Sequence, residues 1–391
     1  MLSLDDLLRP ISAQEFFANH YRKAPLVLPA SETRAGLFSY DGLNEMLAQA
    51  NFWTPATLKV WIDKKAVPAV RYCSNVQTLD GEVLHADPNK VASWLARGAS
   101  VILNGAEGMT PAFRAVADCL ESRLFGYAVA NVYFSFGGHQ AFDSHYDDHE
   151  VFAVQIAGEK TWRVYQGRVD NPVGQPPQGS NTQRLHDQAK GAVAFEHTMR
   201  PGELMYIPRG QYHDALATTD ASLHVTFSVQ PMNGLAVIDL LRKEAARESI
   251  FRDDLPGADG DNAALQARLA ALGQRLSDLA RIDQFERVIR QEQRTRSRPR
   301  GTFSLPQRPT DAHYVVANRN LRMTPRGDGQ VLSDGHQEIS VGAHIMPLVQ
   351  WIFAASDFTF GEAVAEFPAL ARDEVNDLVS AMAAMGVLRK L

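Results

Sequence analysis

Residues 145–165 read HYDDHEVFAVQIAGEKTWRVY, and the rest of the fold can be worked out from this stretch. Its two apolar runs, 151–156 and 161–165, lie on either side of a turn that begins with Gly158 and Glu159. Short apolar runs joined by a glycine turn are typical of neighbouring antiparallel strands. The stretch therefore predicts a β-hairpin that follows directly on His145-Tyr-Asp147.

The strand pattern continues on both sides of this hairpin. Further apolar runs cover 129–136, 194–199, 204–207 and 223–229, and Pro201-Gly202 forms one of the turns between them. Strands that follow one another in this way indicate an antiparallel sandwich or barrel, and a jelly roll of this type can hold a pocket between its sheets. Short helices are expected before the strands, starting near Ser12, Asp87 and Pro111. We assign residues 1–232 to this α+β unit.

Helices replace strands after Pro231. The sequence predicts helices over 235–251 and 263–290, and the second carries leucines at helical spacing: Leu265, Leu269, Leu272, Leu276 and Leu279. Such a leucine stripe is usually core, but little neighbouring sequence is left to cover it. We therefore expect residues 233–300 to form a helical dimerisation region. The alternative is that these helices fold back on the barrel of the same chain.

The last segment, residues 301–391, is expected to form a third unit. Helices are predicted over 347–354, 360–367 and 372–385, with Thr359 as a cap and a short strand over 387–389. Helices that end in a strand favour a winged-helix arrangement. The third helix begins Arg372-Asp-Glu-Val-Asn-Asp and is acidic. Direct DNA binding is therefore not expected.

The composition is that of a soluble globular protein. The chain has 391 residues, of which 45% are hydrophobic and 21% charged, values that favour two or three domains with sizeable cores. No apolar run approaches the roughly 20 residues needed to cross a bilayer, and the acidic start does not resemble a secretory signal. Cys73 and Cys119 form neither a disulfide framework nor a metal-binding pair. We expect a cytoplasmic protein.

The charge of the chain is uneven along its length. A formal net charge of -6 argues against a surface devoted to nucleic acid. Between Glu286 and Arg300, however, six arginines stand against two glutamates. A solvated helix end that runs into a linker over 297–309 would explain this stretch, whereas the functional alternative is a contact with RNA or a ribosomal particle.

His145 and Asp147 are the residues most suggestive of chemistry. Residues two apart on an extended chain point to the same side, so an imidazole and a carboxylate face together. A third ligand would complete the facial triad of non-haem Fe(II) oxygenases, and His213 is the candidate because it follows a Pro-Arg-Gly turn at the start of a further strand. An H-x-D pair alone is weak evidence, since surface ion pairing produces the same pattern.

Lys160 strengthens this interpretation. It begins the strand antiparallel to 151–156, so its ammonium can point into the barrel. Burying an unpaired charge costs several kcal/mol. The lysine therefore predicts an anionic partner inside the barrel, which a dicarboxylate cosubstrate would supply.

Three motifs resemble the JmjC-type ribosomal oxygenases. They run from His145 to Phe152, from Gly158 to Tyr165 and from Ile207 to His213, in that order. The resemblance implies a cupin-type double-stranded β-helix that uses Fe(II), 2-oxoglutarate and O2 to hydroxylate ribosomal proteins. It covers the whole chain in outline, as JmjC barrel, helical dimerisation region and winged helix, although the C-terminal third matches only in pattern.

The resemblance also implies roles for individual residues. His145, Asp147 and His213 would hold the iron, and Lys160 would bind the far carboxylate of 2-oxoglutarate. Three further residues fall where the family lines its active site: Asn131, Tyr133 and Ser228.

Other histidines are less easily assigned. The chain departs from the family at Ser144, where proline is common, and at His149, where an apolar residue is usual. His149 shares strand parity with His145 and Asp147, so it is a decoy ligand, a substrate contact or a solvated histidine at the barrel mouth, of which we favour the last. His224 is expected in the core or beside a ligand, and three others in loops or at the surface: His139, His186 and His197.

Protein hydroxylation is the function that the resemblance favours. A histidine is preferred to an arginine as the hydroxylated residue, and a ribosomal protein is the expected partner. One alternative is a JmjC oxygenase that acts on methyl-lysine, a tRNA base or a peptide product. The other is a non-enzymatic metal-binding cupin that regulates through its winged helix, but such a binding module needs neither open iron positions nor Lys160.

Overall fold

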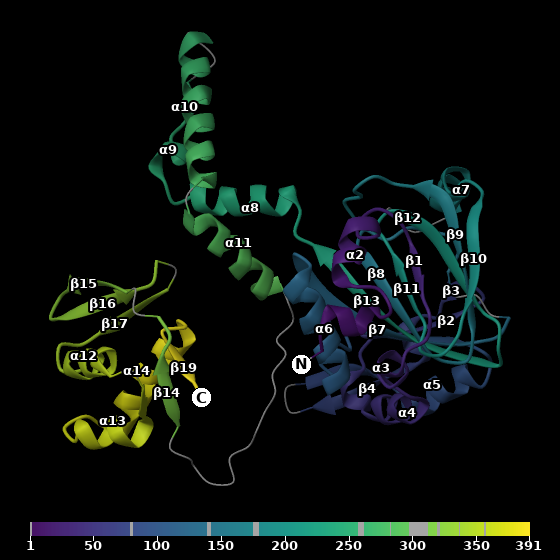
Figure 1. Cartoon of the computed structure of the whole chain (residues 1–391), viewed down its shortest axis with the longest axis horizontal. Coiled ribbons are helices and arrows are strands. Elements are labelled where there is room, and N and C mark those ends of the chain that lie inside the picture. Colours follow the sequence, from purple (N-terminus) through teal and green to yellow (C-terminus); the bar gives the residue numbers. More distant parts are fainter. Residues whose placement is uncertain are drawn as a thin grey trace. The chain divides into compact units, whose positions relative to one another are not determined.

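The computed structural model describes residues 2–78, 81–138, 142–174, 180–256, 262–281, 283–296, 312–318, 321–335, 337–355 and 357–391. The chain divides into two compact units, residues 1–301 and 302–391. The first unit contains an eight-stranded sheet, a three-stranded sheet, the two-stranded sheet of β4 and β5, and most of the helices, and the second is a smaller mixed unit (Figure 1).

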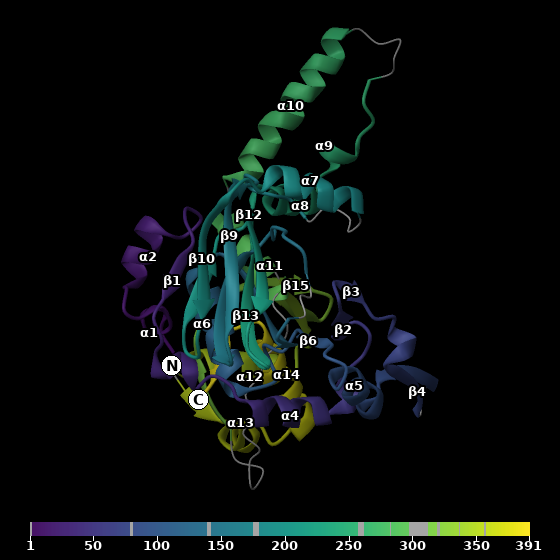
Figure 2. The same ribbon diagram turned by 90° about the vertical axis from the view of Figure 1, so that its right-hand side faces the viewer.

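Two sheets form the antiparallel barrel that the strand pattern predicts. The larger sheet has the strand order β1-β11-β8-β13-β7-β6-β2-β3, the smaller one the order β10-β9-β12, and all neighbours pair antiparallel. Figure 2 shows β9, β10 and β12 of the smaller sheet beside β13 of the larger one. The strands are β1 (Leu26–Leu28), β2 (Leu58–Ile62), β3 (Lys65–Ala66), β6 (Ser100–Asn104), β7 (Gly126–Phe136), β8 (Glu150–Ala157), β9 (Lys160–Arg168), β10 (Val193–Met199), β11 (Leu204–Ile207), β12 (Gln211–Ala217) and β13 (Ala221–Pro231).

Strand β8 is buried on both faces because each face meets a different core. Val151 and Ala153 belong to the core between the two sheets, together with Trp162 of β9. Phe152 and Val154 point to the opposite side and join the larger core that the N-terminal segments cover. Alternate side chains of a strand point to opposite faces, so a continuous apolar run serves both cores.

Short helices precede and cover the larger sheet. The caps expected at Ser12 and Asp87 are confirmed: Ser12 Oγ accepts from the backbone N–H of Glu15 at 3.1 Å, and Asp87 caps the helix that starts at Pro88. These elements are α1 (Leu4–Leu8), α2 (Ala13–Asn19), α3 (Glu32–Ala35), α4 (Tyr40–Ala48), α5 (Pro88–Leu95) and α6 (Pro111–Arg123), with the hairpin β4 (Cys73–Thr78) and β5 (Gly81–Ala86).

A fully buried arginine fastens the N-terminal segment to the barrel. Arg34 of α3 is 0% exposed. Its Nε donates to the carbonyl of Gly202 at 2.9 Å, and its Nη1 donates to the carbonyls of Leu7 and Arg9 at 2.7 and 2.9 Å. Nη2 reaches the carbonyl of Pro29. One planar group thus connects the end of α1, the residue after β1 and the turn before β11.

The helical region after the barrel contains more elements than the sequence predicts. It consists of α8 (Gly234–Ala245), α9 (Ser249–Arg252), α10 (Asn262–Ala280) and α11 (Asp283–Arg296). The single helix expected over 263–290 is therefore wrong. The chain turns between α10 and α11 so that Phe285 packs with Leu240, Leu241 and Leu279, and a straight helix would carry Phe285 away from these leucines.

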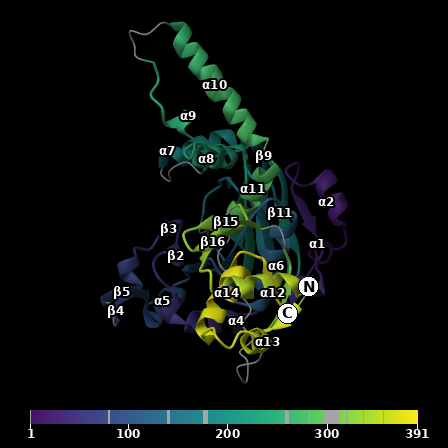
Figure 3. The same cartoon turned by 90° about the vertical axis from the view of Figure 1, so that its left-hand side faces the viewer.

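The leucine stripe of α10 is largely uncovered. Leu269 is 53% exposed and Leu276 is 39% exposed, whereas Leu279 is buried. In Figures 1 and 3, α10 extends away from the barrel. The described part of the chain therefore leaves an apolar face of α10 in contact with solvent.

The arginine-rich stretch is only partly described. Arg290 pairs with Glu286 at 2.7 Å and Arg296 with Glu292 at 3.1 Å, both within α11. Such internal pairs are those of a solvated helix. Arg298 and Arg300 lie outside the described residues.

The C-terminal unit has its own core. Its elements are β14 (His313–Val316), β15 (Arg322–Arg326), β16 (Gly329–Ser333), β17 (Glu338–Val341), α12 (Met346–Ala354), β18 (Asp357–Thr359), α13 (Phe360–Glu366), α14 (Arg372–Ala384) and β19 (Leu388–Lys390). The expected cap is present: Thr359 Oγ1 accepts from the backbone N–H of Glu362 at 3.2 Å. Two three-stranded sheets have the orders β18-β14-β19 and β15-β16-β17, and the winged-helix assignment stays a prediction.

None of the described helices combines the length and the apolar composition that a membrane span requires.

The Arg34 contacts predict a large effect of substitution on stability. Arg34→Met removes four hydrogen bonds to carbonyl groups, and the buried carbonyls lose their donor. We expect a loss of at least ~3 kcal/mol in the free energy of unfolding, measured by urea denaturation. Arg34→Lys should recover little of it, because one ammonium does not reach all four carbonyls. Wild-type stability of Arg34→Met would contradict this account.

Candidate active site

Backbone pairing brings the three predicted ligands together. His145 and His213 form an isolated antiparallel bridge, in which each backbone N–H donates to the other residue's carbonyl at 3.0 and 2.9 Å. The N–H of Gly210 donates to the Asp147 carbonyl at 2.7 Å. Gly210 has φ +82°, and a Cβ there would collide with the carbonyl of Val169. The turn before His213 therefore requires glycine.

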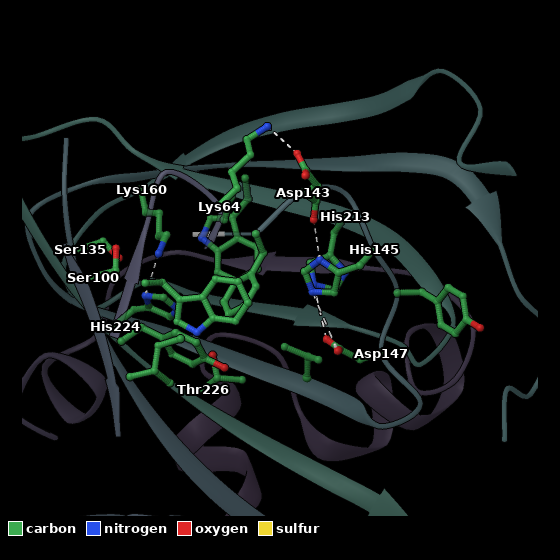
Figure 4. Close-up of a pocket in the computed structure, with 18 of the residues that line it drawn as sticks. Lys64, Ser100, Ser135, Asp143, His145, Asp147, Lys160, His213, His224 and Thr226 are labelled. Atoms are coloured by element: carbon green, nitrogen blue, oxygen red, sulfur yellow. Dashed lines mark hydrogen bonds and ion pairs between the residues drawn. The ribbon is translucent and has the colours of Figure 1, made fainter. Parts of the chain in front are cut away.

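The side chains of His145, Asp147 and His213 converge (Figure 4). Asp147 Oδ2 is 3.5 Å from His213 Nε2, Asp147 Oδ1 is 4.0 Å from His145 Nε2, and one ligand atom of each residue lies within 4.8 Å of the others. Ligand atoms about 2.1 Å from a shared ion and at right angles to one another would be about 3 Å apart. Small side-chain rotations suffice to close the triad around an ion.

The other ring nitrogens fix the form of the two histidines. His145 Nδ1 lies 2.8 Å from the Asp143 carbonyl, and His213 Nδ1 lies 3.0 Å from the Gln211 carbonyl. A carbonyl is an acceptor, so each Nδ1 carries the proton and each Nε2 presents its lone pair. Hydrogen bonds of this kind orient metal-binding histidines. The donor set therefore fits a divalent metal ion.

Burial keeps His213 in the neutral form that binds metals. The ring is 4% exposed and is stacked on Trp162 at a centroid distance of 5.9 Å. Burial, together with the neighbouring His145, lowers the pKa of His213 to about 4. A metal ion then competes with no proton at neutral pH.

The triad lies in a cavity of about 530 Å³ between the two sheets. Figure 4 shows the triad on one side of this cavity and Lys160 with His224 on the other. The residues that line it include Trp61, Lys64, Tyr133, Ser135, Asp143, His145, Asp147, His149, Lys160, Trp162, Thr182, Gln183, His186, His213, His224 and Ser228.

Lys160 is buried without an anion. Its side chain begins β9, is 6% exposed, and its Nζ lies 3.5 Å from His224 Nδ1. The His224 ring is stacked on Tyr133 with a centroid distance of 4.6 Å and an interplanar angle of 7°. Burial lowers the pKa of Lys160 to about 7. Within the described ranges no carboxylate pairs with this amine, so its positive charge is unbalanced when it is protonated.

Ser228 and Tyr133 line the cavity as expected, but Asn131 does not. Ser228 is 5% exposed, and its Oγ has no hydrogen-bond partner among the described residues. Asn131 Oδ1 accepts from the backbone N–H of Gly105 at 3.2 Å, and the amide hydrogen-bonds the Tyr133 side chain. Asn131 therefore contacts the residue that follows β6 and does not line the cavity.

One histidine assignment is wrong. His186, expected in a loop or at the surface, is 9% exposed on α7 (Ser180–Ala189), where its Nδ1 lies 3.1 Å from the Tyr212 hydroxyl. His149 lines the cavity with its side chain 18% exposed, and its Nε2 lies 3.8 Å from Asp147 Oδ1. His139 lies outside the described residues.

Some lining residues carried no signal in the sequence. Trp61 and Lys64 come from the β2–β3 hairpin, and Lys64 forms an ion pair with Asp143. Thr182 and Gln183 come from α7, whose polar sequence does not by itself predict a helix. Gln183 Nε2 donates to the Ser144 carbonyl at 3.1 Å, directly before the first ligand. These contacts depend on tertiary structure, so spacing does not reveal them.

Known proteins resemble the chain in this region. The JmjC-domain family pattern matches residues 108–236, which contain the triad and Lys160. Ribosomal oxygenase 1 from Gallus gallus is 30% identical over 259 residues, which cover 65% of this chain and 41% of that protein. Residues 108–236 thus match the JmjC domain, and the chain is similar to ribosomal oxygenases.

Other proteins show a similar likeness. A protein named bifunctional lysine-specific demethylase and histidyl-hydroxylase NO66, from Drosophila persimilis, is 27% identical over 263 residues, which cover 65% of this chain and 36% of that protein. The chain thus spans less than half the length of these curated relatives. YcfD, a ribosomal oxygenase from Escherichia coli solved with cobalt and 2-oxoglutarate, covers 97% of this chain and 98% of its own with a TM-score of 0.52. At 15% identity this likeness supports the fold.

The buried lysine predicts a pH-dependent stability of the protein without ligands. The folded-state pKa of about 7 lies below the ordinary value of 10.5, so the unfolded chain binds the proton more tightly. Stability is therefore greatest above about pH 10.5 and is lost as the pH falls toward 7, by on the order of 1 kcal/mol per pH unit.

Lys160→Met removes this titration. We expect the variant to unfold at a higher temperature than wild type at pH 7, and the difference to shrink at pH 9.5, as measured by calorimetry. Equal pH profiles for the two proteins would show that Lys160 is not buried as described.

Proposed function

We propose that the chain is an Fe(II)- and 2-oxoglutarate-dependent oxygenase that hydroxylates a side chain of a ribosomal protein. One observation carries the proposal: a two-histidine, one-carboxylate cluster shares a cavity with a buried lysine that pairs with no carboxylate of the described residues. The cluster fits a metal with open coordination positions. The lysine fits the far end of a dicarboxylate.

The residues of the cavity have separate roles in binding the metal and the cosubstrate. His145, Asp147 and His213 hold the iron, which when bound couples the oxidative decarboxylation of 2-oxoglutarate to hydroxylation of a C–H bond. Lys160 binds the far carboxylate of 2-oxoglutarate, and the unpartnered Ser228 hydroxyl offers that carboxylate a hydrogen bond. Tyr133, stacked on His224, holds the position of that ring beside Lys160. Trp162 shields His213 from water.

The cavity suits a histidine better than an arginine as the target. Its lining contains two acids, of which Asp143 forms an ion pair with Lys64 and Asp147 belongs to the triad. A guanidinium brought inside would need a carboxylate, because an unpaired buried charge costs several kcal/mol. A neutral imidazole needs only hydrogen-bond partners such as those of Ser135, Thr182 and Gln183. The name of the Drosophila persimilis relative includes histidyl-hydroxylase.

We further propose that the protein acts in the cytoplasm as a homodimer. Cys73 and Cys119 are both buried free thiols, which a reducing compartment preserves. The exposed face of α10 offers Leu269 and Leu276 for a self-complementary contact with a second copy. We also propose that residues 302–391 form a winged-helix unit. The start of α14 is acidic, so direct DNA binding is not an expected role of this unit.

Substitution of the ligands tests the metal site. Asp147→Ala leaves two imidazoles, so Fe(II) affinity and succinate formation from 2-oxoglutarate should collapse while the melting temperature of the metal-free protein changes little. Asp148→Ala is the matched control, because Asp148 is adjacent but interacts with Gln230 instead of the cluster. Wild-type succinate formation by Asp147→Ala would refute the ligand assignment.

The substrate is tested on ribosomal proteins. Mass spectrometry of ribosomal proteins from cells with and without the gene should show one protein that gains the mass of one oxygen atom on a histidine. Incubation of the unmodified protein with the enzyme, Fe(II) and 2-oxoglutarate should restore the modification. A modified arginine would overturn the argument from the cavity lining, and no modified ribosomal protein would overturn the substrate class.

The dimer is tested at α10. Light scattering should give twice the chain mass for wild type, and Leu269→Asp with Leu276→Asp should give the mass of a monomer, because each charge is costly in an apolar interface. The matched control is Gln266→Asp with Gln274→Asp, at exposed polar positions of the same helix. A wild-type monomer at micromolar concentration would defeat the proposal.

A further inference from the structure

His149 lies beside the candidate iron ligands. Its side chain lines the cavity and is 18% exposed, and its Nε2 is 3.8 Å from Asp147 Oδ1. It directly precedes β8, two residues after Asp147. The cavity therefore presents a third imidazole to the carboxylate of the triad.

The other nitrogen of this ring determines where its proton lies. His149 Nδ1 is buried and has no hydrogen-bond partner in the part of the chain that the structure describes. A neutral imidazole carries one proton, and a carboxylate oxygen attracts an N–H and repels a lone pair. The proton therefore belongs on Nε2, where it faces Asp147. A buried Nδ1 without a partner costs about 1–3 kcal/mol, so packing alone is a poor reason for a histidine at this position.

Each oxygen of Asp147 has its own nearest imidazole. Oδ2 is 3.5 Å from His213 Nε2, whereas Oδ1 is 3.8 Å from His149 Nε2 and 4.0 Å from His145 Nε2. A carboxylate that binds a metal through one oxygen leaves the second oxygen for a hydrogen bond, and such hydrogen bonds orient ligands and raise metal affinity.

We propose that His149 is a positioning residue for the metal site. Its Nε2–H donates to Asp147 Oδ1 and so directs Oδ2 toward the ion beside His213. A small rotation closes the 3.8 Å distance to that of a hydrogen bond. The inference rests on the proposed function, since it assumes that Asp147 is a metal ligand, and it assigns His149 no bond to the metal.

Two substitutions separate the hydrogen bond from the shape of the ring. His149→Leu introduces an apolar side chain of similar size that has no hydrogen-bond donor, whereas His149→Gln retains an N–H group that can face Asp147. The measurement is the dissociation constant of Co(II), which can be followed by quenching of tryptophan fluorescence without turnover. The visible absorption of bound Co(II) in the presence of 2-oxoglutarate reports the ligand set independently of activity.

We expect His149→Leu to weaken Co(II) binding by about 10–100-fold, the range for residues that support a metal ligand. His149→Gln should recover most of this loss, with the same Co(II) spectrum as wild type. His197→Gln is the control, because His197, which lies on β10, pairs with Glu203 and does not line the cavity. It should bind Co(II) as wild type does.

Three outcomes would overturn the proposal. His149→Leu with wild-type Co(II) affinity would show that the ring has no role at the metal. A changed Co(II) spectrum in both variants, without recovery in His149→Gln, would make His149 a ligand itself. If metal-free His149→Leu has a lower melting temperature, and its partial unfolding explains the whole loss of Co(II) affinity, the role of His149 is structural. If Asp147→Ala also binds Co(II) with wild-type affinity, the assignment of Asp147 as a metal ligand is wrong, and the His149 proposal loses its basis.

Discussion

The pairing of residues 145–147 with residues 210–213 is the constraint on which the site depends. Two hydrogen bonds join the backbones of His145 and His213, and a third joins Gly210 to Asp147. Ligands that are separated by more than sixty positions in the sequence are thereby set by backbone geometry before any metal binds. Gly210 makes this possible, because its conformation and its contact with Val169 leave no room for a side chain.

The second feature of the cavity is its buried polar groups. They lower the stability of the fold but are suited to binding a ligand. Among the described residues, Lys160 has no carboxylate partner and Ser228 Oγ has no hydrogen-bond partner, so this cavity is destabilised relative to an apolar one. Such polar groups persist at sites where a ligand satisfies them. A bound dicarboxylate would restore the proton of Lys160 and give Ser228 a donor role, so the ligand would stabilise the fold as well as serve the reaction.

The sequence predicted the parts of the site that follow from local periodicity. His145 and Asp147 share a face because they are two residues apart, and Lys160 points inward because it begins the facing strand. The place of Asn131 was not predictable in this way, since its hydrogen bond to Gly105 comes from a distant strand end. His186 was missed because the polar helix α7 lies between strands and has no apolar stripe that marks it. The turn between α10 and α11 depends on the packing of Phe285, which is likewise tertiary.

The most direct test of this account is a crystal structure of the protein soaked anaerobically with Mn(II) and 2-oxoglutarate. The account predicts one anomalous peak within about 2.3 Å of His145, Asp147 and His213, with the far carboxylate of 2-oxoglutarate on Lys160. A metal bound elsewhere, or 2-oxoglutarate whose far carboxylate avoids Lys160, would contradict it.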